Sequence, residues 1–341
     1  MRKLDWLRVI AAAHAAGVDT RTDSGITVRR VSGGNNNAIC RVEADGQVAA
    51  CKLCVADERR RAAHEYAALH ALYTAKLDIA PEPLWLDETC QVVPYPVVAY
   101  RWLPGEPRGP SITDGQLDAL LASVQLMHTL EPAHHPELTD SWFHWFDFSR
   151  YLSELDGFLN HYGSWLETDD PAGHDLSHRL MRLLDDCKQF VATTRVKPDR
   201  EQVALRLCRA DTNLSNAIWN DDDHVRWVDW EYSGWGDPAL EMAELRWHAA
   251  MTGLSQEQHE RLRSNYQRPR SDPRFDERLA VWDRLITTRW AFLILRALWS
   301  AHNGPDRVRL SRMPADPARL RARLVQFVER AEQLAAHSSK P

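Results

Sequence analysis

Three oxygen-bearing side chains occur in one short stretch of this 341-residue chain, at a spacing that suits phosphoryl transfer. Asp211 follows residues 203–208, whose alternating and then apolar pattern predicts a strand packed on at least one face. Residues 212–216 are small and amide-rich, which favours a loop ending at Asn216. Asp229 lies further along, and oxygen ligands from Asn and Asp suit Mg²⁺.

A second, short strand pair is predicted over residues 217–219 and 225–228, joined by a polar acidic turn. Such a hairpin can bring Asp211, Asn216 and Asp229 to one point, although 18 residues separate the two aspartates. A hairpin of purely structural role with an acidic turn is the alternative interpretation.

Three motifs in this stretch resemble those of a known family. Asp211-x4-Asn216 is followed by Val-Asp-Trp-Glu at 228–231 and by Gly-Trp-Gly-Asp-Pro at 234–238. Together they resemble the aminoglycoside phosphotransferase and choline kinase family, the small-molecule branch of the protein-kinase-like fold. The Gly-Asp-Pro element separates that branch from true protein kinases.

The resemblance implies a role for each of the three residues. Asp211 would orient the acceptor hydroxyl and take its proton, and it is the candidate catalytic residue. Asn216 would hold one Mg²⁺, and Asp229 would bridge metal and nucleotide phosphates.

The chain departs from the family pattern at Arg209, because the family usually has His two residues before the catalytic aspartate. Arg209 could orient the loop by pairing with a carboxylate, or it could approach phosphate. It could also mark weakened catalysis.

A kinase of this fold needs a glycine-containing turn over the phosphates, and one candidate lies between strand patterns at 26–30 and 39–43. Glycine lets backbone N–H groups approach anionic oxygen, and Asn tolerates positive φ. The candidate cofactor-binding residues of this turn are Ser32, Gly33, Gly34 and Asn35.

The fold also needs a strand lysine held by a helix glutamate. Lys52 is the single lysine in the strand pattern 47–55, where a charge is costly unless it meets an anion. Residues 58–76 have apolar positions at helical spacing, and Glu65 lies early among them. We expect Lys52 to pair with Glu65 beside the α and β phosphates, with Glu58 as the competing partner.

The run from Val97 to Pro107 resembles the family's hinge, where a strand stops at a Leu-Pro-Gly-Glu turn. In that alignment Tyr100 abuts the adenine pocket, while the backbone C=O of Arg101 and the N–H of Leu103 meet the base edge. Because these contacts use the backbone, the side chains of the hinge do not distinguish ATP from GTP. ATP is the expected nucleotide, and GTP is possible.

The resemblance implies an α+β, bilobal, protein-kinase-like fold. Residues 1–103 would form an N-terminal nucleotide-binding lobe of antiparallel sheet plus helix, including the hinge. Residues 104–341 would form a mostly helical catalytic and acceptor-binding lobe, whose first helix begins with a capping box of Thr113 and Gln116. Further helices are predicted over 151–166, 176–192, 239–251, 256–266, 275–302 and 315–336.

Fourteen tryptophans are many for this length, and an aromatic face can bind an ammonium group. Trp230 and Trp235 are the better candidates because they flank Asp229, while core packing is the alternative for each. The other candidates are Trp142, Trp145 and Trp290. His144 could meet substrate, but a helix cap is the preferred interpretation.

Composition and cysteine usage indicate a reduced, globular, cytoplasmic protein. The hydrophobic fraction is 44%, and the longest apolar run near the end, interrupted by Arg296, is too short for a membrane span. The start of the chain favours an amphipathic helix over a signal peptide. Cys51 and Cys54 form a Cys-x-x-Cys, yet no second pair completes a zinc site.

The net charge of −6 is unevenly distributed. Residues 111–260 carry −16, which favours a cationic acceptor such as an amino sugar or a quaternary amine, although acidic helices can be merely solvated. Residues 261–341 carry +9, but their arginines alternate with apolar residues at helical intervals, which fits amphipathic helices better than nucleic-acid binding.

The leading hypothesis is a phosphotransferase that uses ATP and Mg²⁺ to phosphorylate a hydroxyl of a small, amine-bearing molecule. A kinase-like protein that binds nucleotide or metabolite with little or no turnover is the alternative. A protein kinase is disfavoured by Gly236-Asp237-Pro238, and a P-loop NTPase is excluded because no Gly-x4-Gly-Lys-Ser/Thr occurs. We expect a small-molecule acceptor as partner, no nucleic acid and no membrane, and a monomer or a homodimer.

Overall fold

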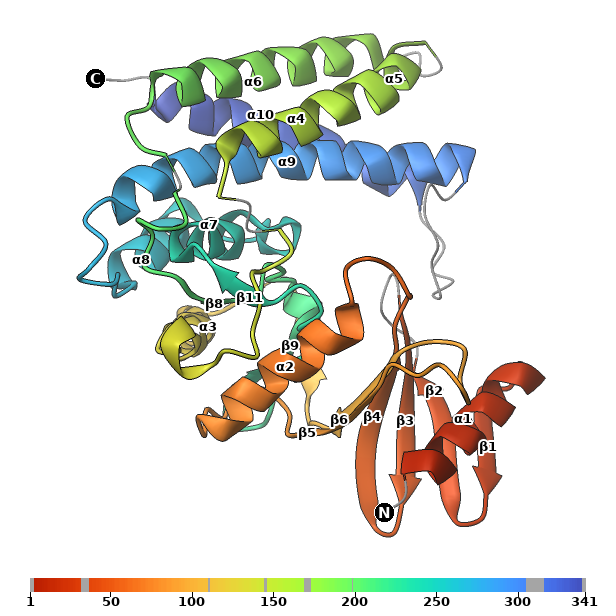
Figure 1. Ribbon diagram of the computed structural model, residues 1–341. Coiled ribbons are helices and arrows are strands. Elements are labelled where there is room, and N and C mark those ends of the chain that lie inside the picture. The colour runs from red at the N-terminus through yellow and green to blue at the C-terminus, as the bar shows by residue number, and fades with distance from the viewer. Residues whose placement is uncertain are drawn as a thin grey trace. The chain divides into compact units, whose positions relative to one another are not determined.

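The computed structural model describes residues 3–31, 37–109, 111–143, 146–168, 173–197, 199–304 and 316–338 (Figure 1). The chain divides into two compact units. Of the described residues, the first unit holds those up to 142 together with 214–235, and the second holds the rest. These units do not test the predicted lobe boundary after Leu103, which stays a prediction.

The first unit is built on a six-stranded antiparallel sheet with the order β1-β2-β3-β4-β6-β5. Its central strands alternate or run buried, as expected for a sheet covered on its faces. The strands are β1 (Thr20–Asp23), β2 (Ile26–Val31), β3 (Ala38–Ala44), β4 (Gln47–Leu53), β5 (Pro83–Asp87) and β6 (Val97–Arg101).

Helix α1 (Lys3–Ala16) covers one face of this sheet. Its apolar side chains at helical spacing, such as Trp6 and Ile10, form one core with Cys40, Cys51 and Leu53. Successive strand residues point to opposite faces, so Lys52 points away from this core.

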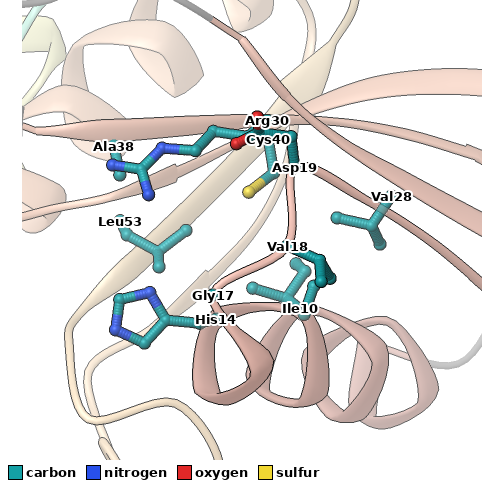
Figure 2. Close-up of a pocket in the computed structure, with 11 residues that line it drawn as sticks. Ile10, His14, Gly17, Val18, Asp19, Val28, Arg30, Ala38, Cys40 and Leu53 are labelled. Atoms are coloured by element: carbon teal, nitrogen blue, oxygen red, sulfur yellow. The ribbon is translucent and has the colours of Figure 1, made fainter.

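A small pocket lies in this α1 core, lined on one side by Ile10 and His14 and on the other by Val28, Cys40 and Leu53 (Figure 2). Its accessible volume of about 30 Å³ has room for a few water molecules only. It contains none of the predicted site residues.

Two helices and a second sheet complete the first unit. Helix α2 (Arg61–Thr74) follows β4, and α3 (Asp114–Met127) begins with the predicted capping box of Thr113 and Gln116. Strands β7 (Glu106–Pro107), β9 (Ala217–Trp219) and β10 (Val225–Trp227) form a sheet of order β10-β9-β7. Trp227 donates its Nε1–H to Ser123 Oγ at 2.8 Å, which ties β10 to α3.

The second unit is mostly helical. In Figure 1, α4 and α6 lie along the long helix α9, which also packs against α10. One apolar core joins these helices, with Leu155, Leu180, Phe292 and Phe327 fully buried. The elements are α4 (Phe148–Phe158), a π-helical turn (Leu159–Gly163), α5 (Ser164–Thr168), α6 (Gly173–Thr193), β8 (Arg206–Cys208), α7 (Pro238–Trp247), α8 (Gln256–Asn265), α9 (Phe275–Asn303) and α10 (Pro317–Ser338).

Helix α7 is buried along its whole length, and Asp237 fixes its start. Asp237 accepts the backbone N–H of Ala239 at 2.9 Å, and Pro238 occupies the first helical position, where its missing N–H costs nothing. The same carboxylate accepts Arg278 Nε at 2.8 Å and Trp282 Nε1 at 2.9 Å, both from α9. The Gly-Asp-Pro element therefore anchors α7 to α9.

The sequence predicted most of these elements, including α1, the hairpin β9–β10 and the helices of the second unit. The predicted helix 239–251 is interrupted at His248, whose φ of −53° and ψ of 147° end α7 before a 3₁₀ turn (Ala249–Met251). The predicted strand 203–208 is only three residues long in β8, and β1, β5, β7 and β11 (Gly234–Gly236) were not predicted.

Within the described residues, no helix combines the length and the apolar character that crossing a bilayer requires.

Gly234 lies where two backbones meet, so a side chain there should destabilise the first unit. Trp235 donates its N–H to Thr139 O at 2.8 Å, and a Cβ on Gly234 would lie 2.6 Å from Ser141 N and 2.7 Å from Asp140 C. We expect Gly234→Ala to lower the free energy of unfolding by about 1–3 kcal/mol, measured by urea denaturation.

Gly115 in α3 is the matched control, because a Cβ there meets nothing within 4 Å. Gly115→Ala should raise the free energy of unfolding by about 0.5–1 kcal/mol. Equal stability of the two variants would contradict the close approach at Gly234.

Candidate active site

Lys52 is the centre of a charged cluster in the first unit. Strand β4 presents its side chain, which is 2% exposed, and Nζ lies 2.6 Å from Glu65 Oε2. Glu65 lies on α2, so the predicted ion pair is confirmed, whereas Glu58, the alternative, precedes that helix. Nζ also donates to Asp229 Oδ1 and lies 3.2 Å from Glu231 Oε2.

One lysine thus faces three carboxylates, and their charges shift the pKa of the lysine. Burial alone would lower the pKa of Lys52, but the charges of Asp229, Glu231 and Glu65 outweigh it and hold that pKa well above its usual value. Burial raises the pKa of Glu65, against the lowering effect of Lys52. Lys52 is therefore a fixed positive charge at neutral pH.

Glu231 is the buried carboxylate that joins Lys52 to a second cation. It accepts Arg61 Nη1 at 2.7 Å through Oε1, while Oε2 accepts the side-chain amide of Asn37. Burial would raise the pKa of Glu231, but Lys52 and Arg61 hold it below its usual value. Asn37 Oδ1 in turn accepts the N–H of Val55 at 3.1 Å, which holds the chain just after β4.

The β9–β10 hairpin positions Asn216 and Asp229 together. Asn216 directly precedes β9, and its carbonyl accepts the N–H of Val228 at 2.9 Å, so it lies across from the residue next to Asp229. Asp229 has a φ of 65°, a left-handed conformation that non-glycine residues seldom adopt. Its side chain stays 31% exposed although Trp227 and Trp230 around it are buried.

Asp211 lies in the second unit, in the loop that follows β8. The residue before it, Ala210, has a φ of 60°. Glu241 of α7 stabilises this turn, because its two carboxylate oxygens accept the N–H groups of Arg209 at 3.1 Å and Ala210 at 3.0 Å. Burial raises the pKa of Glu241 to about 7, although these bonds and Arg209 oppose the rise.

Two donors reach one oxygen of Asp211. Oδ1 lies 3.2 Å from Nε2 of His248, which ends α7, and accepts the N–H of Asn213 at 3.1 Å. Burial would raise the pKa of Asp211, but the hydrogen bond and charge of His248, together with Arg209, keep it below its usual value. The carboxylate is 26% exposed and ionised at neutral pH, so it can accept a hydrogen bond from a hydroxyl.

Arg209 is buried beneath this loop, with 1% of its surface exposed. Its Nη2 donates to the backbone carbonyl of Asp211 at 2.8 Å. This contact favours the loop-orienting role over a direct approach to phosphate. This hydrogen bond goes to a backbone carbonyl, whereas the sequence suggested a carboxylate as the partner.

The predicted nucleotide residues are only partly described. Ser32, Gly33, Gly34 and Asn35 lie outside the described residues. Tyr100 and Arg101 lie at the end of β6, paired with Ala50 and Ala49, and Tyr100 is 4% exposed. Leu103 is half-buried just beyond the strand.

Tryptophans flanking Asp229 are core residues. Trp230 is fully buried and donates Nε1–H to the carbonyl of Trp227 at 2.8 Å, and Trp235 is 3% exposed. Trp142 and Trp290 are half-buried, while His144 and Trp145 lie outside the described residues.

Glu231, Arg61, Glu241 and His248 were not among the predicted site residues. Glu241, Glu244 and His248 recur at helical spacing after Gly-Asp-Pro, on a segment that is otherwise apolar except for Arg246, and that pattern could have revealed them. Nothing in the local pattern around Arg61 indicates its partner, since Glu231 lies 170 residues away in sequence.

The family model described as the phosphotransferase enzyme family matches residues 27–279, which include Lys52, Asp211 and Asp229. The chain belongs to this family. The match confirms the predicted family and the predicted class of enzyme, a small-molecule phosphotransferase. No curated protein matches the sequence significantly.

Solved structures confirm the predicted protein-kinase-like fold. A protein from Ralstonia eutropha described as an aminoglycoside phosphotransferase is 15% identical, with a TM-score of 0.63 over 96% of this chain and 98% of that one. Spectinomycin phosphotransferase, in complex with ADP and spectinomycin, is 11% identical, with a TM-score of 0.61 over 94% and 93%. Choline kinase from Streptococcus pneumoniae is 13% identical, with a TM-score of 0.56 over 96% and 98%.

Removing the charge of Glu231 should strongly destabilise the first unit. In Glu231→Gln an amide N–H₂ would face the donors of Arg61, Lys52 or Asn37, and a buried donor would be left without an acceptor. Lys52 would keep Glu65 and Asp229 as anionic partners, and Arg61 would keep Asp57. We expect a loss of about 1–3 kcal/mol in the free energy of unfolding, measured by urea denaturation.

The exposed pair of Arg60 and Glu88, 3.2 Å apart, supplies the control. Glu88→Gln should cost less than about 1 kcal/mol. A loss for Glu231→Gln no larger than that of the control would show that the buried network contributes little.

Proposed function

We propose that this protein transfers the γ-phosphoryl group of ATP, with Mg²⁺, to a hydroxyl of a small, amine-bearing molecule. The observation that carries the proposal is the partly exposed carboxylate of Asp211, which His248 and the N–H of Asn213 hold in an ionised form. In the role proposed for it, Asp211 orients the acceptor hydroxyl and accepts its proton. Catalysis would rest on positioning and charge, with no covalent intermediate.

The donors around the predicted metal site fit Mg²⁺. Asp229 offers a carboxylate that is 31% exposed, and Asn216, half-buried, offers an amide oxygen from the 3₁₀ turn just before β9. Hard oxygen ligands in small number suit Mg²⁺, which keeps several waters and relies on substrate phosphates for other ligands. When bound, the ion would neutralise charge on the phosphate oxygens.

Lys52 supplies the fixed positive charge for the nucleotide. Its side chain is pinned by Glu65 and Glu231, so little conformational entropy remains to be lost when it meets a phosphate. In this proposal Ser32 to Asn35 cover the phosphates, and the backbone of Arg101 and Leu103 meets the base beside Tyr100. The nucleotide lobe would end at Leu103.

An amine-bearing acceptor is proposed from charge. The stretch 111–260 carries −16, and it includes the partly exposed carboxylates of Asp211 and Asp229. An acidic site concentrates cationic ligands through long-range attraction. The related structures include enzymes named for spectinomycin and for choline, whose names fit this class of acceptor.

A kinase-like binding protein with weak turnover is the second candidate, motivated by Arg209 in place of the usual histidine. The contact of Arg209 with the Asp211 carbonyl supports a competent loop, which favours the active enzyme.

Asp211→Asn should lower kcat by about 10²–10⁴-fold while nucleotide binding persists, because the amide cannot accept the proton. We would measure coupled ADP release over a panel of aminoglycosides, macrolides, choline, ethanolamine, thiamine, homoserine and sugars. MgATP binding by isothermal titration calorimetry is the control for folding and for the nucleotide site.

Retained turnover in Asp211→Asn would overturn the role of this residue. Binding of MgATP by the wild type with no ADP release above the Asp211→Asn blank for any acceptor would favour the binding protein. Turnover that survives EDTA would contradict the metal site at Asn216 and Asp229.

A further inference from the structure

We infer that His248 is the positioning residue of Asp211, and that it acts through a hydrogen bond whose direction the fold has fixed. This inference rests on the proposed function, in which Asp211 is the base. The two nitrogens of the His248 imidazole each make one contact, Nδ1 with the N–H of Ala250 and Nε2 with Asp211.

The first contact fixes the tautomer. His248 Nδ1 accepts the backbone N–H of Ala250 at 3.0 Å, so Nδ1 cannot carry the proton of a neutral ring. The proton is then on Nε2, which lies 3.2 Å from Asp211 Oδ1. In this tautomer Nε2–H donates to the carboxylate.

The second group of contacts fixes the ring in place. The N–H of His248 donates to Glu244 O at 2.9 Å, and its carbonyl accepts the N–H of Met251 at 2.8 Å. The indole of Trp290 from α9 meets the imidazole edge to face, with centroids 4.3 Å apart, and is itself held by Glu244 Oε2 at 3.2 Å. With 4% of its surface exposed, His248 has little freedom to rotate.

The consequence for catalysis concerns one oxygen of Asp211. Oδ1 accepts two hydrogen bonds, from His248 and from Asn213, so we place the acceptor hydroxyl at Oδ2. Arg209 occupies the sequence position of the usual histidine and donates to the carbonyl of the same residue. His248 thus supplies from α7 an imidazole contact to the carboxylate.

Two substitutions separate positioning from a merely structural role. In His248→Asn the short amide oxygen can still cap the N–H of Ala250, since Asn is a good cap, but it cannot reach Asp211. In His248→Gln the longer amide can take the place of Nε2 and donate to Asp211, while the cap is weakened. His248→Asn therefore keeps the contact with Ala250, and His248→Gln keeps the contact with Asp211.

We would measure ADP release from MgATP with the best acceptor of the panel above, or with water as acceptor if none scores, together with thermal unfolding. We expect His248→Asn to lose about tenfold to a hundredfold in kcat with nucleotide KM unchanged, and to keep its melting temperature. His248→Gln should recover most of kcat in spite of a lower melting temperature. The reverse ranking, or full kcat in both variants, would overturn the inference.

Asp211→Asn separates this inference from the proposed function. If that variant is inactive while His248→Asn is fully active, only the role of His248 fails. If Asp211→Asn is active, the proposed function fails first.

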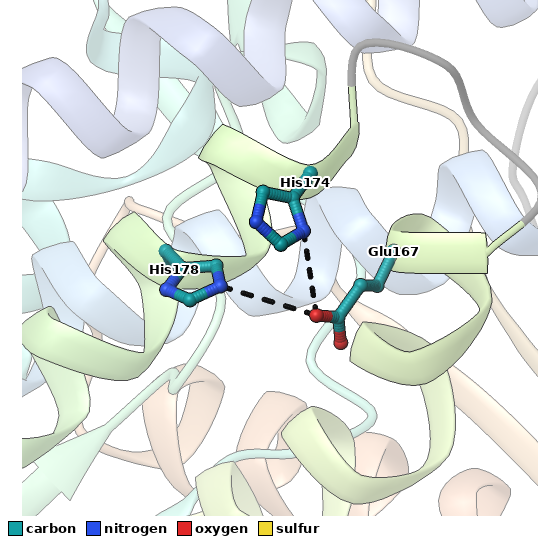
Figure 3. A group of neighbouring side chains, drawn as sticks. All are labelled: Glu167, His174 and His178. Carbon is teal, nitrogen blue, oxygen red and sulfur yellow. Dashed lines mark ion pairs between the residues drawn. The ribbon is translucent and has the colours of Figure 1, made fainter.

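A second, independent observation points to a metal site on the surface of the second unit. Glu167 of α5 and His174 and His178 of α6 direct one ligand atom each toward a common point, and these atoms lie within 4.8 Å of one another (Figure 3). Glu167 Oε1 is 3.4 Å from His174 Nδ1 and 3.9 Å from His178 Nε2. We propose that this cluster, the Glu167 site, binds a divalent transition metal such as Zn²⁺.

The spacing of the histidines carries this proposal. Residues four apart share one face of a helix, and the two rings lie with centroids 4.4 Å apart. Ligand atoms of a tetrahedral zinc site, with bonds of about 2.0–2.1 Å, are about 3.3 Å apart, so small side-chain rotations would close the geometry. All three residues are exposed, which gives the ion access and leaves a fourth position for water.

Isothermal titration of the full chain with ZnCl₂ tests the Glu167 site. We expect one site of micromolar affinity, weakened at least about tenfold in His178→Ala and in Glu167→Gln, and a zinc-dependent rise in melting temperature that both variants lose. His70→Ala, at an exposed histidine of α2, is the control and should bind as the wild type does. Equal binding by His178→Ala and the wild type, or no binding at all, would overturn the proposal.

Discussion

The positive charge of Lys52 is the constraint on which the first unit depends. A lysine with 2% of its surface exposed is tolerated only beside anions, and three carboxylates reach it from α2 and from the segment after β10. Because those carboxylates exceed the lysine in charge, Glu231 takes Arg61 as a second cation, and Asp229 keeps part of its surface open. The buried carboxylates of the cluster are thus paired with cations, while the carboxylate of Asp229 is partly exposed.

In the second unit, the buried helix α7 positions the loop that carries Asp211. Asp237 anchors the start of α7 through Arg278 and Trp282, and Glu241 one turn later holds the backbone before Asp211. His248, at the end of the same helix, contacts the carboxylate of Asp211. A displacement of α7 would therefore move the backbone and the side chain of the loop together, and the Gly-Asp-Pro element matters because it fixes that helix.

The sequence predicted the features that depend on residues close to one another along the chain. The Lys52 to Glu65 pair followed from one charge in an apolar strand, an acid in the next helix and the family resemblance. The capping box at Thr113 and the hairpin β9–β10 followed from short-range signals. What the sequence could not reveal depends on long-range contacts. Arg61 meets Glu231 across 170 residues, and α7 stops at His248 because Nδ1 caps Ala250, which helical periodicity does not encode. Trp230 and Trp235 looked available to a ligand from their place in the sequence, yet both are buried.

Two of the eight described non-glycine residues with positive φ lie beside the charged groups of the site. Ala210, just before Asp211, and Asp229 itself both have positive φ, at a cost of about 1–2 kcal/mol each for a residue with a side chain. Glycine would adopt either conformation without that cost, but it would also leave the loop free to adopt others. Specific hydrogen bonds offset this strain. Glu241 accepts the N–H of Ala210, and Lys52 donates to Asp229. Both loops are therefore held in one conformation by buried charges, which is the preorganisation that transfer of a phosphoryl group to a positioned hydroxyl requires.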